Sequence, residues 1–600
     1  MDPALQELIR SDLDQDDQVE VVVRLKDPRL LPKKLKMVTQ FGNIVTCRIR
    51  RGDIKETYHS PWVKSFKASK YVVDEPLLRY HSADRSETLL PVLSRQNSTL
   101  PSGKGVVVGV IDWGIDFAHP NFRDADGGSR LLGLWDQSQT WDPMTQPYGY
   151  GRCYLKQEIN QALASKQPYR ALRYHPAKGD PRNTGAHGTH VMDIAAGNGS
   201  VGYMGVAPAA DLVFVHLAAK GTGPLANLGD SVRILEAIDF VSRLANDRPL
   251  VINLSVGRHG GHHRGTSLVE QGMDRFLEQR RNTVICQSTG NYYKAQAHTS
   301  GIVRPGRAQE FFFWNDQADR TPNELEVWYP GSDQFIFELH HPEIPVGWRC
   351  DPQQNTAIEI NGLLVGKVYH RNTEPNTGLN HINLFLYPNA PAGRWQVRLF
   401  GKKITDGRYH AWIERDGACP GCQSRFLKKY TDPSHTTGTI CNGFNTIAVG
   451  AVRELQHETR MAPFSSMGPT TDGRVKPDLV APGVRIVAAR SAPRTSQQGG
   501  AGLTRMSGTS MAAPHVTGTV ALMLETIRKP VEIHQIRNIL LGSTDELSPT
   551  GNEKMRMGSG LLNLQNALKS VRKYNRTLGR RKSLTTGSRR FARSGKPAHV

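Results

Sequence analysis

Ser510 is the residue of this chain whose type and setting point most directly to chemistry. It lies in the sequence Gly-Thr-Ser-Met-Ala-Ala-Pro-His at 508–515, and the small, apolar residues 516–525 that follow predict a buried helix. The first turn of a helix has free backbone N–H groups and the positive end of the helix dipole, so an anion that forms beside Ser510 would be stabilised. Because a serine hydroxyl attacks poorly unless a base removes its proton, the hypothesis requires a histidine and a group that orients it.

Asp112 and His187 meet that requirement. Asp112 ends the apolar, β-branched run at 106–111, which is typical of a central parallel strand. Open α/β sheets place their chemistry at the carboxyl ends of such strands. His187 begins the sequence His-Gly-Thr-His-Val at 187–191, where a predicted helix starts beside small residues that let a substrate approach. Four nearby polar residues are expected to be structural: Asp116, His119, His190 and His515.

The segments that hold these three residues share a pattern with a known family. Residues 109–120, 187–191 and 508–516, in the chain order Asp, His, Ser, resemble the subtilisin-like serine proteases. Three such motifs in order are far more specific than one. The stretches 205–217, 251–257, 289–291 and 464–483 resemble the same family, so the likeness extends over most of residues 105–570. It implies a parallel-sheet α/β catalytic domain.

The resemblance implies a serine endopeptidase that works through an acyl-enzyme on a protein or peptide substrate. Ser510 would attack the peptide carbonyl, His187 would move the proton, and Asp112 would hold the imidazole. Asn291 and the backbone N–H of Ser510 would bind the oxyanion. This chemistry needs no metal and no cofactor. An extended peptide would be added as a strand at Leu217, Gly221, Ser255, Val256 and Gly257.

The residues ahead of the catalytic segments predict a small α+β domain. Residues 19–25 and 44–49 indicate strands, 31–39 a short helix, and 63–73 a strand, turn and strand. The arrangement is similar to the propeptides of the family, which implies a self-processing zymogen cut between about residues 74 and 101. An accessory domain that is never removed remains the alternative.

Two insertions distinguish the chain from a minimal member of the family. The first lies between Asp112 and His187 and contains a predicted helix at 157–164. The second follows Asn291 and alternates polar and apolar residues through several short segments, which predicts an all-β sandwich. A sandwich at this place resembles the jelly roll of the bacterial, germination-associated Csp subgroup. Rigidifying the enzyme and recognising a partner are both open as its role.

These patterns divide the chain into predicted domains. A propeptide-like domain at 1–80 and a linker at 81–104 precede the catalytic domain, 105–296 and 433–570, which is interrupted by the sandwich at 297–432. The final segment, 571–600, contains ten Lys and Arg and no Asp or Glu, within a chain of net charge +21. Such a run predicts a disordered tail, and contact with nucleic acid or an anionic surface is a weaker alternative.

Metal sites are not expected. Many members of the family bind calcium through an acid after a His-Pro pair and an amide in a later loop, but Asn121 and Gly199 occupy these places here. Losing one charge and one ligand weakens a hard-cation site, so no tight calcium is predicted. Cys419 and Cys422 are the one closely spaced cysteine pair, and free thiols are favoured over a redox pair or half of a zinc site.

The remaining expectations concern specificity and setting. Arg258 and His259 follow the predicted cleft strand, which suggests a cationic rim that favours acidic or small side chains. No uncharged stretch is long enough to span a bilayer and the start lacks a signal-peptide pattern, so the cytoplasm is the expected compartment. The rival function is a catalytically silent binding or scaffold protein that retains the fold.

Overall fold

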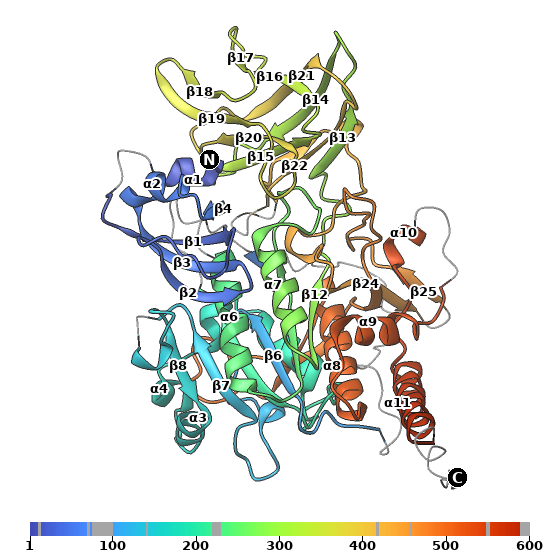
Figure 1. Cartoon of the computed structure of the whole chain (residues 1–600). Coiled ribbons are helices and arrows are strands. Elements are labelled where there is room, and N and C mark those ends of the chain that lie inside the picture. Colours follow the sequence, from blue (N-terminus) through green and yellow to red (C-terminus); the bar gives the residue numbers. More distant parts are fainter. Residues whose placement is uncertain are drawn as a thin grey trace, which may run out of the picture.

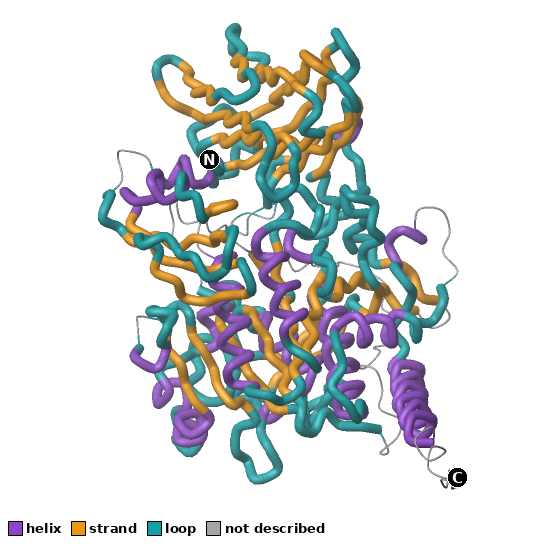
Figure 2. Tube along the Cα trace, in the orientation of Figure 1, coloured by secondary structure: helices purple, strands orange, loops and turns teal. Residues whose placement is uncertain are grey.

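The computed structural model of the chain has three regions, each built around its own β-sheet or pair of β-sheets. It describes residues 1–9, 14–68, 73–74, 100–139, 142–218, 230–415, 419, 421–455, 458–547 and 553–587. A mixed helix-and-strand body is flanked by a small N-terminal sheet and a region made almost wholly of strands (Figures 1 and 2). This is the α/β architecture with an added small α+β part and an added all-β part that the sequence predicts.

The body contains a sheet in the order β25-β24-β12-β10-β6-β9-β7-β8, with β26 beside β24. The pairs β6–β9, β6–β10, β10–β12, β12–β24, β7–β9 and β24–β26 are parallel, whereas β7–β8 and β24–β25 are antiparallel. The central strands are β-branched and fully buried, as expected for a sheet covered on both faces. The strands are β6 (Val107–Asp112), β7 (Leu131–Asp136), β8 (Arg152–Leu155), β9 (Asp211–His216), β10 (Leu250–Leu254), β12 (Thr283–Ser288), β24 (Ile447–Leu455), β25 (Glu458–Met461) and β26 (Leu479–Pro482).

Two helix pairs cover this sheet. Helices α5 (His187–Ala196) and α8 (Thr509–Thr526) pack against each other, and α6 (Asp230–Ala245) packs against α7 (Leu268–Gln279). Residues 509–524 of α8 are all buried, which agrees with the prediction of a core helix after Ser510. The first insertion adds α3 (Lys156–Leu163), at the place predicted, and α4 (Pro168–Leu172). Helix α9 (Ile533–Leu541) and the hairpin of β27 (Ile486–Arg490) and β28 (Gly502–Met506) complete the body.

The N-terminal unit, residues 1–68, is an antiparallel sheet in the order β2-β3-β1-β4 with two short helices. The helix predicted at 31–39 is wrong, because this stretch instead leads into strand β2. Residues 36–41 pair with β3 through a tight turn in which Gly42 has φ 59°, and that tertiary pairing overrides the local helical pattern. The elements are α1 (Pro3–Leu8), β1 (Gln18–Leu25), β2 (Lys36–Phe41), β3 (Ile44–Arg50), α2 (Ile54–Tyr58) and β4 (Val63–Ala68).

The inserted region is a sandwich of two antiparallel sheets with its own apolar core. One sheet runs β13-β22-β15-β20-β19-β18 and the other β17-β16-β21-β14-β23. The predicted period-two segments supply the strands, because alternate residues face the space between the sheets. The strands are β13 (His298–Ile302), β14 (Ala308–Asn315), β15 (Asn323–Tyr329), β16 (Gln334–His340), β17 (Trp348–Cys350), β18 (Asn355–Ile360), β19 (Leu363–Arg371), β20 (Asn380–Leu386), β21 (Gly393–Lys403), β22 (Arg408–Ile413) and β23 (Arg425–Phe426).

Two further expectations need correction. The predicted disordered tail was 571–600, but helix α11 (Leu564–Gly587) continues into it, so residues 571–587 are helical. Residues 588–600 lie outside the described residues. Val571 is buried and Tyr574 packs on the same apolar core, which extends the helix beyond the predicted end of the domain. Cys419 and Cys422 form a disulfide instead of free thiols, because the turn between them brings their Cα atoms to 5.5 Å. Among the described helices, none is apolar over a length that would cross a bilayer.

Candidate active site

Three elements of the body place the candidate catalytic residues near the carboxyl end of the central strand β6. Asp112 is the last residue of β6, which lies between β9 and β10. His187 is the first residue of α5, and Ser510 is the second residue of α8. All three side chains are buried, and the two helices that present His187 and Ser510 lie against each other.

Asp112 and His187 form a direct pair. Asp112 Oδ1 lies 2.7 Å from His187 Nδ1 and also accepts a hydrogen bond of 2.6 Å from the backbone N–H of Trp113. A carboxylate at Nδ1 fixes the ring orientation and places the proton on that nitrogen, which leaves Nε2 as the basic atom. This half of a proton-transfer system is therefore assembled.

Ser510 lies at the start of α8 with its hydroxyl uncommitted. Its Oγ atom is buried and makes no hydrogen bond to any residue within the described ranges. The carbonyl of Ser510 accepts a hydrogen bond of 3.2 Å from Ser255 Oγ, and Asn253 Nδ2 donates to the same Ser255 oxygen at 2.9 Å. The predicted cleft residue Ser255 thus holds the backbone of the predicted nucleophile.

Asn291 is oriented for a donor role by a residue that the sequence analysis did not single out. Asn291 Oδ1 accepts hydrogen bonds from the N–H and the hydroxyl of Thr509, at 3.0 and 3.1 Å. Because its oxygen faces those two donors, the amide nitrogen points elsewhere, and it lies close to Gly508. The position of Thr509 inside the Gly-Thr-Ser motif was the available signal for its role.

The predicted substrate strand is already paired with another strand. Strand β11 (Val256–Gly257) forms an antiparallel pair with β5 (Val73–Asp74), in the register Val256 with Asp74 and Gly257 with Val73. The chain that follows the N-terminal unit therefore lies along the edge expected to receive a peptide. Leu217 is buried and its N–H donates to the carbonyl of Asp112, at 2.9 Å, whereas Gly221 lies outside the described residues.

The expectation of a cationic rim is wrong. Arg258 is only 6% exposed, and its guanidinium meets Glu414 at 2.5 Å, Glu324 at 3.2 Å and Glu326 at 3.9 Å. Burial also lowers the pKa of His259 well below its usual value, which keeps that ring neutral. The sandwich supplies the acidic partners, and no local sequence pattern reveals that contact.

The other polar residues of the motifs have structural partners. His190 Nε2 lies 3.1 Å from the carbonyl of Ile486, and burial lowers the pKa of His190 to about 3. His515 Nδ1 lies 2.9 Å from the carbonyl of Met511, and burial lowers its pKa to about 4. Each of these rings contacts a backbone carbonyl, whereas His187 contacts the carboxylate of Asp112.

The residues at the place of the family's calcium site do not fit a cation. Asn121 Nδ2 donates to Asp193 Oδ1 at 2.8 Å and to the carbonyl of Val201 at 2.9 Å. A hydrogen-bond donor thus points at the oxygens that a cation would need. Burial raises the pKa of Asp193 to about 7, which further reduces its value as an anionic ligand.

Comparison with known proteins finds a matching family model and similar sequences. The model of the subtilase family matches residues 103–313 and 423–560. The minor extracellular protease Vpr of Bacillus subtilis is 24% identical over 506 residues, which cover 78% of this chain and 52% of Vpr. The PII-type proteinase of Lactococcus lactis subsp. cremoris is 23% identical over 531 residues, which cover 78% of this chain and 25% of that protein. The chain thus spans about half or less of the length of these relatives.

A solved structure shows the same fold over most of the chain. The CspB protease of Clostridium perfringens superimposes with a TM-score of 0.66 at 24% sequence identity. The alignment covers 79% of this chain and 96% of the CspB chain. At this level of identity the likeness establishes the fold, and the arrangement of side chains rests on the contacts described above.

Proposed function

Because the chain belongs to the subtilase family, we propose that it is a serine endopeptidase whose catalytic residues are Asp112, His187 and Ser510. The observation that carries the proposal is the 2.7 Å contact between Asp112 and His187, whose helix α5 packs against α8, the helix with Ser510 as its second residue. A carboxylate, an imidazole and a hydroxyl near the carboxyl ends of parallel strands are the groups that acyl transfer requires.

Hydrolysis would run in two halves. In the first, Ser510 Oγ attacks the peptide carbonyl while His187 Nε2 takes the hydroxyl proton, and the same proton then passes to the leaving amine. In the second, His187 takes a proton from water, the hydroxide attacks the acyl-enzyme, and the proton returns to Ser510 as the acid leaves. Asp112 stabilises the imidazolium that forms in each half.

The oxyanion of each tetrahedral intermediate would be bound by two donors. One is the backbone N–H of Ser510 in the first turn of α8, where the helix leaves such groups free. The other is Asn291 Nδ2, which is oriented because Thr509 engages the amide oxygen. Donors fixed before the reaction stabilise the developing charge without reorganisation.

We also propose that the N-terminal unit is a cleavable propeptide. Its sheet packs on α6 and α7, with Phe41 against Phe276 at a ring distance of 5.9 Å. The following strand β5 lies on β11 as a substrate would. A chain in that position blocks the cleft until it is cut, and the cut falls between residues 74 and 101.

The test compares Ser510→Ala with the wild type in casein hydrolysis and in the mass of the N-terminal fragment. Loss of the nucleophile should lower turnover by up to about 10⁶ and leave the chain uncut. Ser507→Ala is the matched control, because its hydroxyl accepts from the N–H of Arg485 outside the reacting groups and its removal should preserve activity. Equal hydrolysis by Ser510→Ala would refute the nucleophile, and an inert wild type would favour the scaffold alternative.

A further inference from the structure

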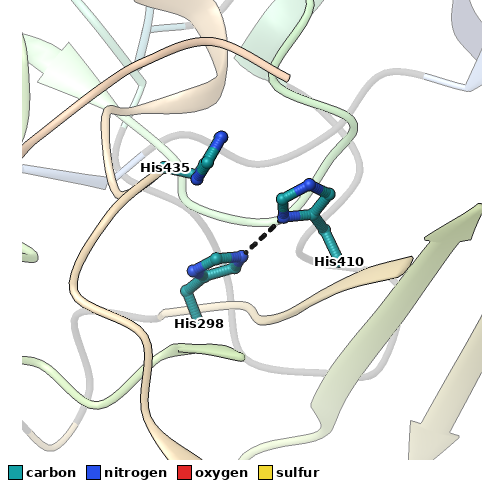
Figure 3. A group of neighbouring side chains, drawn as sticks. All are labelled: His298, His410 and His435. Carbon is teal, nitrogen blue, oxygen red and sulfur yellow. Dashed lines mark hydrogen bonds between the residues drawn. The ribbon is translucent and has the colours of Figure 1, made fainter. Parts of the chain in front are cut away.

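Three histidines from separate parts of the sequence meet where the sandwich joins the body. His298 lies on β13, His410 lies on β22, and His435 lies in the segment that returns to the body (Figure 3). Each offers one ring nitrogen, and the three nitrogens lie within 4.8 Å of one another. Because β13 and β22 pair with Ser300 opposite His410, the first two rings share one face of the sheet.

The distances are close to those of a metal centre. His298 Nε2 and His410 Nδ1 are 3.1 Å apart. Two nitrogens bound at about 2.0–2.1 Å to a tetrahedral zinc ion lie about 3.3–3.4 Å apart, so this pair needs only a small movement. The three nitrogens together lie within 4.8 Å, so His435 closes the remaining gap by a side-chain movement when the ion binds. His298 is fully buried, whereas His410 and His435 are half-buried, which leaves an open side for a water ligand.

The surroundings suit neutral imidazole ligands. His298 Nδ1 lies 3.1 Å from the carbonyl of Asp432, and donation to this oxygen leaves Nε2 without a proton. Nε2 then accepts a hydrogen bond from His410 Nδ1, which a bound metal would replace as that nitrogen loses its proton. Asp432 is held in turn by Ser300 and Ser434, so a fixed carboxylate stands next to the histidines.

We propose that His298, His410 and His435 bind one divalent transition-metal ion, with Zn²⁺ as the preferred ion and water as its fourth ligand. Three imidazoles and a water form a set that zinc accepts, and the absence of carboxylate ligands disfavours Mg²⁺ and Ca²⁺. This departs from the expectation, drawn from the sequence, that the chain uses no metal.

The ion would link the sandwich to the segment around residues 435–438, which contacts the chain just before Asn291, the proposed oxyanion donor. His435 is followed by Gly438, whose N–H donates to the carbonyl of Thr289 at 2.8 Å, two residues before Asn291. Trp412 on β22 also reaches this segment, through a bond of 2.9 Å from Nε1 to the carbonyl of His435. Binding to the folded state alone therefore predicts a higher melting temperature with zinc.

The experiment uses the full chain with Ser510→Ala, so that it stays uncut, and without a polyhistidine tag. After dialysis against a chelator, titration with Zn²⁺ should show one bound equivalent and a raised melting temperature. His410→Ala should weaken zinc binding by at least about 100-fold, because a direct ligand matters more than the outer-shell partners whose loss costs about 10–100-fold. His340→Ala, on the opposite sheet of the sandwich, is the matched control and should bind one equivalent.

Cobalt and a second variant keep the test decisive. Bound Co²⁺ should give the visible absorption of a tetrahedral nitrogen and oxygen site and lack the near-ultraviolet band of a thiolate ligand. If His410→Ala does not fold, His435→Asn replaces it, since Asn tolerates the φ of 54° at that position. The proposal is refuted if the parent binds no zinc, if the folded variant binds it as tightly as the parent, or if a thiolate band appears.

Discussion

The N-terminal unit and the sandwich are both added to the catalytic body, but they are attached in different ways. Val22, Val38, Phe41 and Ile44 of the N-terminal unit belong to the same apolar core as the body's central sheet. The sandwich keeps its own apolar core. It meets the body through charged groups, with Arg258 between Glu324 and Glu414, and through ring contacts such as Trp412 on His263.

The difference bears on what each addition does. The N-terminal unit is followed by β5, which pairs with β11. If β11 receives the substrate, as proposed above, β5 and a substrate would exclude each other. The sandwich instead holds the chain just after β11, because Glu414 accepts hydrogen bonds from the N–H groups of His259 and Gly260. We therefore infer that the first addition is a removable inhibitor and the second a permanent part of the working enzyme.

Of the variants that test this comparison, Asp112→Asn should cause the largest loss of activity. The amide cannot stabilise the imidazolium and favours the wrong tautomer of His187, so kcat should fall by about 10⁴. The rate of self-cleavage should fall in the same proportion, so the N-terminal unit should stay attached, as the sandwich does. Steady-state kinetics and the intact mass measure the two effects, and normal processing would contradict the assigned role.

Asn291→Ala should lower kcat by about 10²–10³ with little change in KM, because it removes one donor to the oxyanion. Thr509→Ala should have a smaller effect of the same kind, since Asn291 Oδ1 keeps its bond from the backbone N–H. Comparison of kcat and KM for the two variants checks the order. An unchanged kcat for Asn291→Ala would exclude it as a donor.

Glu414→Ala tests the attachment of the sandwich. It leaves Arg258 buried with less compensation, and breaking a buried pair costs about 3–5 kcal/mol. Because Glu414 also holds the N–H groups after β11, the variant should raise KM as well as lower the melting temperature of the processed enzyme. A normal KM would show that the sandwich does not support the substrate edge.

Arg48→Ala tests the attachment of the N-terminal unit and should affect only the uncut chain. Arg48 forms two bonds of 2.9 Å to Glu236 of α6, whose carboxyl pKa is raised by burial and lowered by Arg48. Its loss should increase hydrogen exchange in β1 and β3 of the Ser510→Ala chain, while Lys34→Ala, in an exposed ion pair, should not. A defect in processed enzyme would contradict a removable unit.

The sequence predicts the elements that are determined locally. The buried strand before Asp112, the core helix after Ser510 and the alternating strands of the sandwich follow from hydrophobic period, and each appears in the structure. The position of Asp112 next to His187 was also predictable, because motif order and the rule for strand ends both specify it.

Contacts between distant segments were not predictable. The stretch 31–39 has a helical pattern that pairing with β3 overrides, and Arg258 is neutralised by sandwich residues more than sixty positions away. The histidines 298, 410 and 435 are brought together by strand register and by the return of the chain to the body. Such neighbours depend on tertiary topology, which spacing along the sequence does not encode.

Covalent labelling of the processed enzyme with a fluorophosphonate tests the central claim most directly, because this reagent modifies a serine only when a base activates it. The account predicts a single adduct on Ser510, found by peptide mass spectrometry, and a loss of labelling in His187→Ala. An adduct on a different serine, or equal labelling of Ser510 in His187→Ala, would contradict it.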